Sequence, residues 1–141
     1  MSCHVSIHPE LPIVECVFFD VVSAVEFIAG MKESIRLATL NNPPHGERGQ
    51  LLVDCFAIQG NCSITDMFFA LEELAQYQGN ALRRLQQAMI LPEKLSMVVP
   101  FYYWETLCHN RGYEVRWFSA RPPALYWLLK KAVNRVPECV G

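Results

Sequence analysis

The residues best suited to chemistry lie at a strand-to-helix junction in the stretch LLVDCFAIQGNCSITDMF, residues 51–68. An apolar run that holds Asp54 leads through a short loop to Cys62 and Ser63, where a helix is expected to begin. A helix N-terminus presents unpaired N–H groups and a positive dipole end, which would stabilise a phosphate on Ser63. The same environment would stabilise a thiolate on Cys62. The junction is therefore a candidate for phosphorylation or for thiol chemistry.

A structural role for Ser63 explains the same residues. Ser63 and Asp66 have the spacing of a capping box, in which each side chain bonds the backbone N–H of the other residue. Asp66 would also repel a phosphate carried by Ser63. Replacing such a cap by alanine costs about 1 kcal/mol of stability whether or not a kinase exists. Capping is the main role expected of Ser63, and modification is the alternative.

Other candidate metal or nucleophile sites fail on geometry. Cys3, His4 and His8 are zinc-ligand types, but the sequence around them is β-like and offers no fourth ligand. Cys108 and His109 are adjacent, and adjacent helical side chains point about 100° apart, so they do not form a nucleophile–base pair. We expect no metal and no cofactor.

Aromatic residues form a second group of candidates. The four aromatic residues of the run FYYW, residues 101–104, point in different directions around one helical turn and cannot all face inward. At least one Tyr or Trp is therefore expected at the surface. Exposed aromatic side chains often mark an interface or an apolar groove. The candidates for an apolar contact surface are Phe68, Phe69, Tyr102, Tyr103 and Trp104.

Composition limits the function classes. The 141 residues are 52% hydrophobic, and 12 basic residues against 14 acidic ones leave no basic stripe for nucleic acid. The apolar runs are shorter than the roughly 20 residues of a membrane span, and the N-terminus does not resemble a signal peptide. Six cysteines occur without a C-x-x-C pair, which favours reduced core thiols. We expect a soluble, cytoplasmic protein.

Hydrophobic periodicity predicts alternating strands and helices. Strands are expected at residues 12–19, 50–58, 94–100 and 113–119, with a further N-terminal strand within residues 3–8. Helices are expected from Asp20 or Ser23 to about Asn41, from Ser63 to Pro92 with a kink or break near Gly79, through residues 101–111, and from Pro122 onward. This order predicts an α/β sandwich around a mainly parallel sheet of four or five strands. We expect one domain over residues 1–141, with residues 1–10 and 135–141 loose.

Several of these segments resemble a STAS-type domain, the fold of bacterial anti-sigma-factor antagonists and of SpoIIAA-like and small lipid-binding relatives. The resemblance rests on PIVECVFF, LLVD, the helix from Ser63, KLSMVVP and VRWFSARPPALYWLL. In the antagonists an Asp-Ser-x-Gly signature carries a serine that a partner kinase phosphorylates. The resemblance places Asp54 at the strand position and Ser63 at the phosphoserine position. Cys62 replaces the acidic residue of the signature, and Thr65 stands where the glycine would be.

The resemblance implies a non-enzymatic regulatory or protein-interaction module of bacterial type. Its partner protein would dock near the start of the helix after Ser63, and a homodimer remains open. One alternative is a binder of lipid or another small hydrophobic ligand, held in a groove under that helix lined by Phe68 and Phe69. Another is a small thiol-dependent enzyme that uses Cys62 or Cys55. The sequence does not name the partner or the ligand.

Overall fold

The computed structural model describes residues 2–40, 49–60 and 63–133, with side chains described as far as residue 130. The elements in chain order are β1 (Cys3–Ile7), β2 (Ile13–Val21), α1 (Ala24–Leu40), β3 (Gly49–Gly60), α2 (Ile64–Arg83), β4 (Leu85–Ile90), the 3₁₀ turn η2 (Leu95–Met97), α3 (Val99–Asn110), β5 (Glu114–Phe118) and α4 (Arg121–Val133). Of the helices that the structure describes, none combines the length and apolar character needed to cross a membrane.

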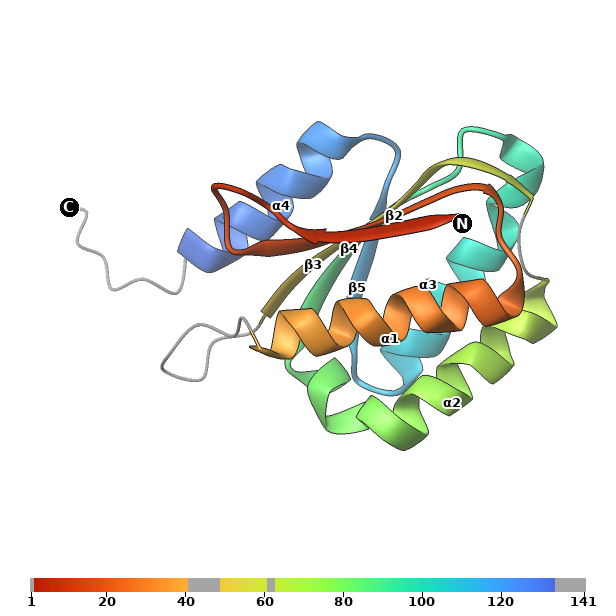
Figure 1. Ribbon diagram of the computed structural model, residues 1–141, viewed down its shortest axis with the longest axis horizontal. Coiled ribbons are helices and arrows are strands. Elements are labelled where there is room, and N and C mark those ends of the chain that lie inside the picture. The colour runs from red at the N-terminus through yellow and green to blue at the C-terminus, as the bar shows by residue number, and fades with distance from the viewer. Residues whose placement is uncertain (1, 41–48, 61–62, 134–141) are drawn as a thin grey trace.

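The strands form one five-stranded sheet in the order β1-β2-β3-β4-β5. β1 runs antiparallel to β2, and the other neighbouring pairs are parallel. Because the parallel strands follow one another in sequence, right-handed crossovers place their connecting helices on the same face. Figure 1 shows α1, α2 and α3 on one side of the sheet and α4 on the other. The predicted α/β sandwich with a mainly parallel sheet is confirmed.

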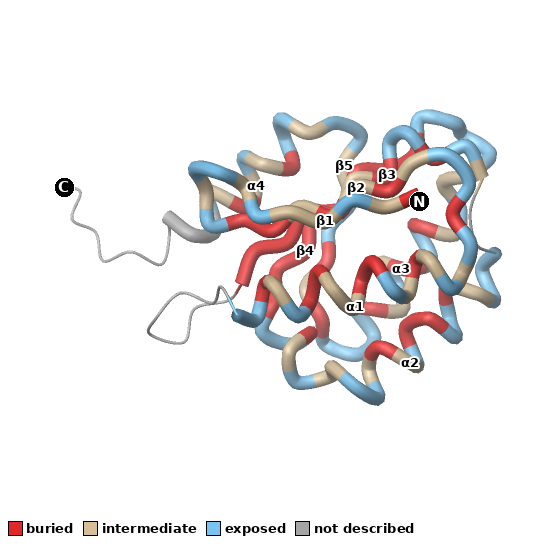
Figure 2. The backbone as a smooth tube through the Cα atoms, viewed as in Figure 1, coloured by how far each residue is buried: buried red, intermediate tan, exposed pale blue. Residues whose placement is uncertain are grey.

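Two hydrophobic clusters fill the spaces between these layers, and Figure 2 shows the buried residues along the strands and on the inward sides of the helices. The larger cluster lies under α1, α2 and α3, where Phe27 packs against Phe18 and edge-on against Trp104. The smaller cluster joins the other face of the sheet to Ala124 and Leu128 of α4. Successive side chains of β3 point to opposite faces of the sheet, so Leu51 and Val53 pack in the larger cluster and Leu52 packs in the smaller one.

β4 was predicted wrongly. Residues 85–90 (LQQAMI) were expected to continue the helix, but they form a strand whose six side chains are all buried. β4 pairs with β3 on one side and β5 on the other, and this central position overrides the local helical spacing. The strand expected at residues 94–100 is also wrong, because η2 and the start of α3 occupy that segment. α2 does kink as predicted, at Gln78, where φ is −134° and ψ is 25°.

The first residues are ordered by pairing. The expectation that residues 1–10 are loose is wrong for β1, which pairs along its length with β2. The predicted N-terminal strand is thus confirmed. Gly112 has φ 80° just past the end of α3, a conformation that suits glycine, as the sequence predicted. Residues 41–48, with His45, and residues 135–141 lie outside the described part of the chain.

Candidate functional site

Ser63 closes the N-terminus of α2 with a complete capping box. Its Oγ accepts a hydrogen bond of 3.1 Å from the backbone N–H of Asp66, and its own N–H donates to the Asp66 carboxylate at 3.1 Å. α1 begins with the same arrangement, in which Ser23 and Glu26 exchange bonds of 3.0 and 3.1 Å. The predicted cap is confirmed, and Ser63 itself is exposed to solvent.

The structure does not bring Asp54 to Ser63. The Asp54 carboxylate accepts the backbone N–H of Phe56 and, at 3.1 Å, a guanidinium N–H of Arg121 at the start of α4. Arg121 also donates to Glu15 of β2 at 2.8 Å. Asp54 therefore faces α4. The preceding residue of β3, Val53, points to the opposite face of the sheet, where it packs in the larger cluster with the core residues of α2. Sequence reasoning missed this ion-pair cluster.

Two of the described thiols, those of Cys55 and Cys108, lie in the core. Cys55 is fully buried, so a substrate has no access to its sulfur. Cys108 is also buried, and this burial raises the pKa of its thiol well above the ordinary value. Cys62 lies outside the described residues. Thr65 is exposed in the first turn of α2 and lies beside the capping box.

The outward face of α2 carries exposed aromatic rings. Phe68 and Phe69 contact each other with ring centroids 5.4 Å apart, and Phe69 is 61% exposed. Tyr77, two turns further along, is 67% exposed. The face of α2 toward the sheet is filled by four buried residues: Met67, Ala70, Leu71 and Leu74. The space under α2 is therefore occupied by its own core side chains, and Phe68 and Phe69 lie on the outward side of α2 rather than beneath it.

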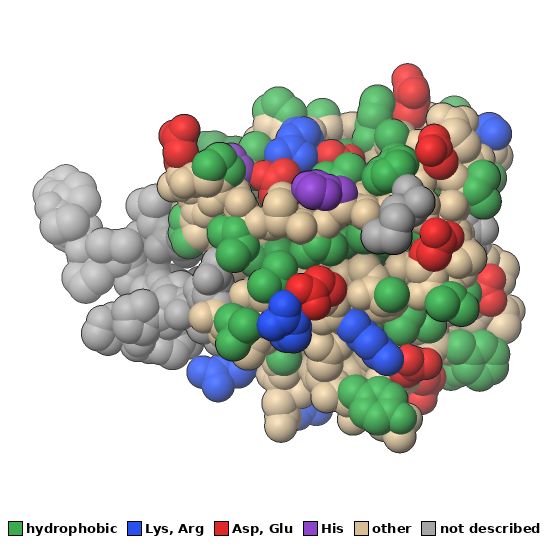
Figure 3. All heavy atoms as spheres, viewed as in Figure 1, with side chains coloured by type: hydrophobic (Ala, Val, Ile, Leu, Met, Phe, Trp, Pro, Cys, Tyr) green, Lys and Arg blue, Asp and Glu red, His purple; other side chains and the backbone are tan. Residues whose placement is uncertain are grey.

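Ion pairs flank these rings on both sides. Glu73 bonds Lys32 of α1 at 2.7 Å, and Glu72 pairs with Arg111 at the end of α3. The Lys32 ammonium also lies 5.3 Å from the centre of the Tyr77 ring. In Figure 3, acidic, basic and hydrophobic side chains lie side by side over α1 and α2. The adjacent residues Glu72 and Glu73 thus join α2 to both neighbouring helices.

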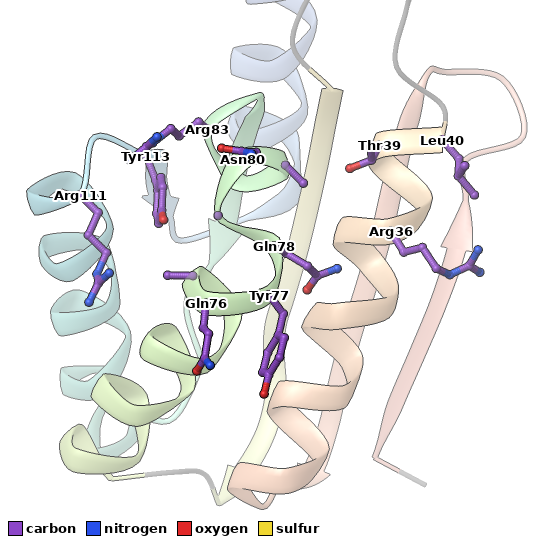
Figure 4. A pocket seen from close by; sticks show the side chains of 13 residues that line it. Arg36, Thr39, Leu40, Gln76, Tyr77, Gln78, Asn80, Arg83, Arg111 and Tyr113 are labelled. Carbon is purple, nitrogen blue, oxygen red and sulfur yellow. The ribbon is translucent and has the colours of Figure 1, made fainter.

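Two hollows continue along the same face. One of about 620 Å³ is bordered by Phe69, Tyr77 and the Glu72–Arg111 pair. The next, of about 630 Å³, lies at the kink of α2 between α1 and the α3–β5 turn (Figure 4). Arg36 borders the second hollow but points away from α2 in this view, and it bonds Glu33 through two nitrogens. Two of the cations that line this hollow are thus already paired, Arg36 with Glu33 and Arg111 with Glu72.

The run at residues 101–104 divides between core and surface as predicted, with one correction. Trp104 is completely buried against Phe27, so its assignment to the contact surface is wrong. Tyr102 and Tyr103 are exposed. The Tyr102 ring contacts Trp117 of β5 with centroids 5.0 Å apart, a contact that the sequence alone did not indicate. The helical period explains the correction, since Phe101, Trp104 and Cys108 share the inward face of α3.

Comparison with known proteins bears on the fold. No protein-family model matches the chain, and no curated protein matches it. Among solved structures, it is similar to the crystal structure of an uncharacterised protein from the DUF3478 family with a SpoIIAA-like fold from Shewanella loihica. The two share 13% identity with a TM-score of 0.55, over 89% of this chain and 91% of that chain. The chain therefore has a SpoIIAA-like fold, as its sequence pattern predicted.

Proposed function

We propose that this chain is a non-enzymatic binding module that docks a partner protein on the outer face of α2, between Ser63 and Tyr77. The observation that carries the proposal is the exposure of Phe69 and Tyr77 on a helix whose opposite side is buried. Exposed rings of this size are costly to leave in water, and a partner that covers them gains the energy of their burial.

The surroundings of the rings fit a protein partner. Protein interfaces combine aromatic anchors with a polar rim, and binding energy concentrates in a few such anchors. Here Phe69 and Tyr77 lie between the Lys32–Glu73 pair and the Glu72–Arg111 pair. The rim thus offers both signs of charge to a partner backbone and its side chains. Side chains of the partner would fit into the two hollows beside Phe69 and Tyr77.

The position of α2 supports the same proposal. α2 is the middle helix of its layer, with α1 and α3 as neighbours (Figure 1). The capping box fixes its N-terminus, and the two ion pairs hold it to the neighbouring helices. A face held in this way loses little conformational freedom on binding, which favours affinity.

Ser63 gives the docking face a means of control. Its Oγ accepts the Asp66 N–H in the capping box, so a phosphate on this oxygen would disturb that bond and meet the Asp66 carboxylate. We propose that the charge introduced by Ser63→Glu weakens partner capture while the fold survives. Partner capture unchanged by Ser63→Glu would place the docking face elsewhere.

A photo-crosslinking residue at position 69 identifies the partner. The matched control carries the same residue at position 126, because Tyr126 of α4 is 66% exposed on the opposite side of the sheet. A protein crosslinked from position 69 and not from position 126 supports docking on α2. Equal crosslinking from both positions, or crosslinking from position 126 alone, contradicts it.

A further inference from the structure

Two cysteine sulfurs outside the docking face lie close together. Cys3 begins β1 and Cys16 lies on β2, and their Sγ atoms are 3.7 Å apart. In the strand register Cys3 is opposite Phe18 and Val5 is opposite Cys16, so the two cysteines are diagonal neighbours. Both pack into the cluster beneath α1, which places them on one face of the sheet.

The two thiols differ in accessibility. Cys16 is completely buried, whereas Cys3 is only partly buried and borders a surface pocket of about 350 Å³ between β1 and α1. Val5 and Gly30 are among the other residues that line this pocket. A small molecule in the pocket would therefore reach the Cys3 sulfur first, with the Cys16 sulfur directly behind it.

Gly30 of α1 makes this arrangement fit. A Cβ at position 30 would lie 2.7 Å from the Cys3 sulfur and 2.9 Å from the Phe18 ring, closer than van der Waals contact allows. The absence of a side chain lets the Gly30 carbonyl approach the Cys16 thiol, at 3.9 Å from its sulfur. α1 thus packs directly over the two thiols.

We propose that Cys3 and Cys16 form a redox-modifiable dithiol, in which Cys3 reacts with hydrogen peroxide and Cys16 then forms a disulfide with Cys3. The Cys3 thiolate attacks one peroxide oxygen, so that an S–O bond forms, the O–O bond breaks, and the departing hydroxide takes a proton to become water. The Cys16 sulfur then attacks the Cys3 sulfenic acid. An S–S bond forms, the S–O bond breaks, and a second water leaves with the Cys16 proton. Two thiols are oxidised by two electrons, and the peroxide is reduced to two waters.

The electrostatics of the pair agree with this order of events. The hydrogen bond from Cys16 lowers the pKa of Cys3, against the opposing effects of partial burial and of the Glu26 charge. The same bond and the burial of Cys16 raise the pKa of Cys16 well above its ordinary value. The reachable sulfur is therefore the one with more thiolate character, and thiolate is the reactive form.

Closing the disulfide requires a small movement. The sulfurs must approach from 3.7 Å to about 2.05 Å. β1 is the outermost strand of the described sheet and pairs there with β2 alone, so β1 is the element that can adjust.

The experiment treats the reduced full-length protein with equimolar hydrogen peroxide, blocks remaining thiols after unfolding, and maps the cysteine peptides by mass spectrometry. The expected product is a Cys3–Cys16 linked peptide, with a loss of about 2 Da from the intact protein that a phosphine reductant reverses. Cys55 and Cys108 in the same sample are internal controls, and Cys3 is expected to be oxidised about tenfold more than either.

Two single variants separate the steps. Cys16→Ser is expected to leave a sulfenic acid on Cys3 that dimedone traps, whereas Cys3→Ser is expected to leave Cys16 unmodified. A wild-type product in which Cys3 is over-oxidised without a Cys3–Cys16 link overturns the proposal, as does a link from Cys3 mainly to another cysteine. This wild-type result does not depend on the folding of either variant.

Discussion

At the scale of single residues, two serines play the same structural part in different helices. Ser23 caps α1 and Ser63 caps α2, each within a reciprocal pair of hydrogen bonds. We predict that Ser23→Ala and Ser63→Ala each lower the free energy of unfolding by about 1 kcal/mol, because each leaves a helix N–H without its partner. Urea denaturation measures both values. A Ser63→Ala protein as stable as the wild type would show that the capping box contributes nothing to α2.

The matched serines also separate stability from binding. Ser63→Glu and Ser23→Glu each alter a similar helix cap. If they weaken partner capture only through a loss of stability, the two variants should weaken it equally. If α2 is the docking face, Ser63→Glu weakens capture and Ser23→Glu does not. Capture reduced to the same extent by both variants would point to a loss of fold rather than of a docking face.

Glu26 makes part of the stability depend on pH. Its hydrogen bond from the backbone N–H of Ser23 lowers its pKa from the ordinary value of 4.5. A carboxylate whose pKa is lower in the folded state stabilises the protein fully above its unfolded pKa and loses this contribution as the pH falls through the folded pKa. We predict that Glu26→Gln reduces the loss of melting temperature on acidification below about pH 4.5. A variant whose melting temperature falls with pH as steeply as that of the wild type would exclude this role.

At the scale of elements, α3 protects the free edge of the sheet. β5 is the last strand of the sheet, and two α3 side chains bond its backbone. The Glu105 carboxylate accepts the Trp117 N–H at 3.2 Å, and His109 Nε2 lies 2.7 Å from the Val115 carbonyl oxygen. A carbonyl oxygen only accepts, so Nε2 carries the donated proton. Edge strands whose backbone groups are left unpaired tend to pair with other chains, and these two side chains occupy such groups of β5.

The double variant Glu105→Ala/His109→Ala is therefore predicted to self-associate through β5. Light scattering during size-exclusion chromatography would show a larger average mass than for the wild type at equal concentration. Thr106→Ala is the control, because Thr106 lies between the two residues on α3 and its hydroxyl donates to the Tyr102 carbonyl oxygen of the same helix. A double variant with the wild-type mass would mean that the β5 edge is not prone to pairing.

The same scale shows which elements a sequence can predict. The cap at Ser63 was predictable, because its partner Asp66 is three residues away and the pattern is local. β4 was not, because Leu82, Leu85 and Met89 have helical spacing and the strand is imposed by its neighbours on both sides. The cluster around Arg121 was missed for a similar reason, since its partners Asp54 and Glu15 are 67 and 106 residues away in sequence.

At the scale of the whole molecule, the two faces of the sheet are used differently. α4 covers one face, with Arg121 at its start bonded to carboxylates of β2 and β3. α1, α2 and α3 cover the other, and α2 is fastened to each neighbour by an ion pair. The exposed aromatic rings at Phe69 and Tyr77 thus lie on a well-supported part of the fold. We place the proposed docking face there for this reason.

The most direct test of the docking face is the affinity of the partner identified by crosslinking from position 69, measured by isothermal titration calorimetry. Phe69→Ser is predicted to weaken this affinity at least about tenfold, because an aromatic anchor contributes a large share of interface energy. Tyr126→Ser, which removes a similarly exposed ring from α4, is predicted to leave it within about twofold. Equal affinities for the two variants would contradict docking on α2.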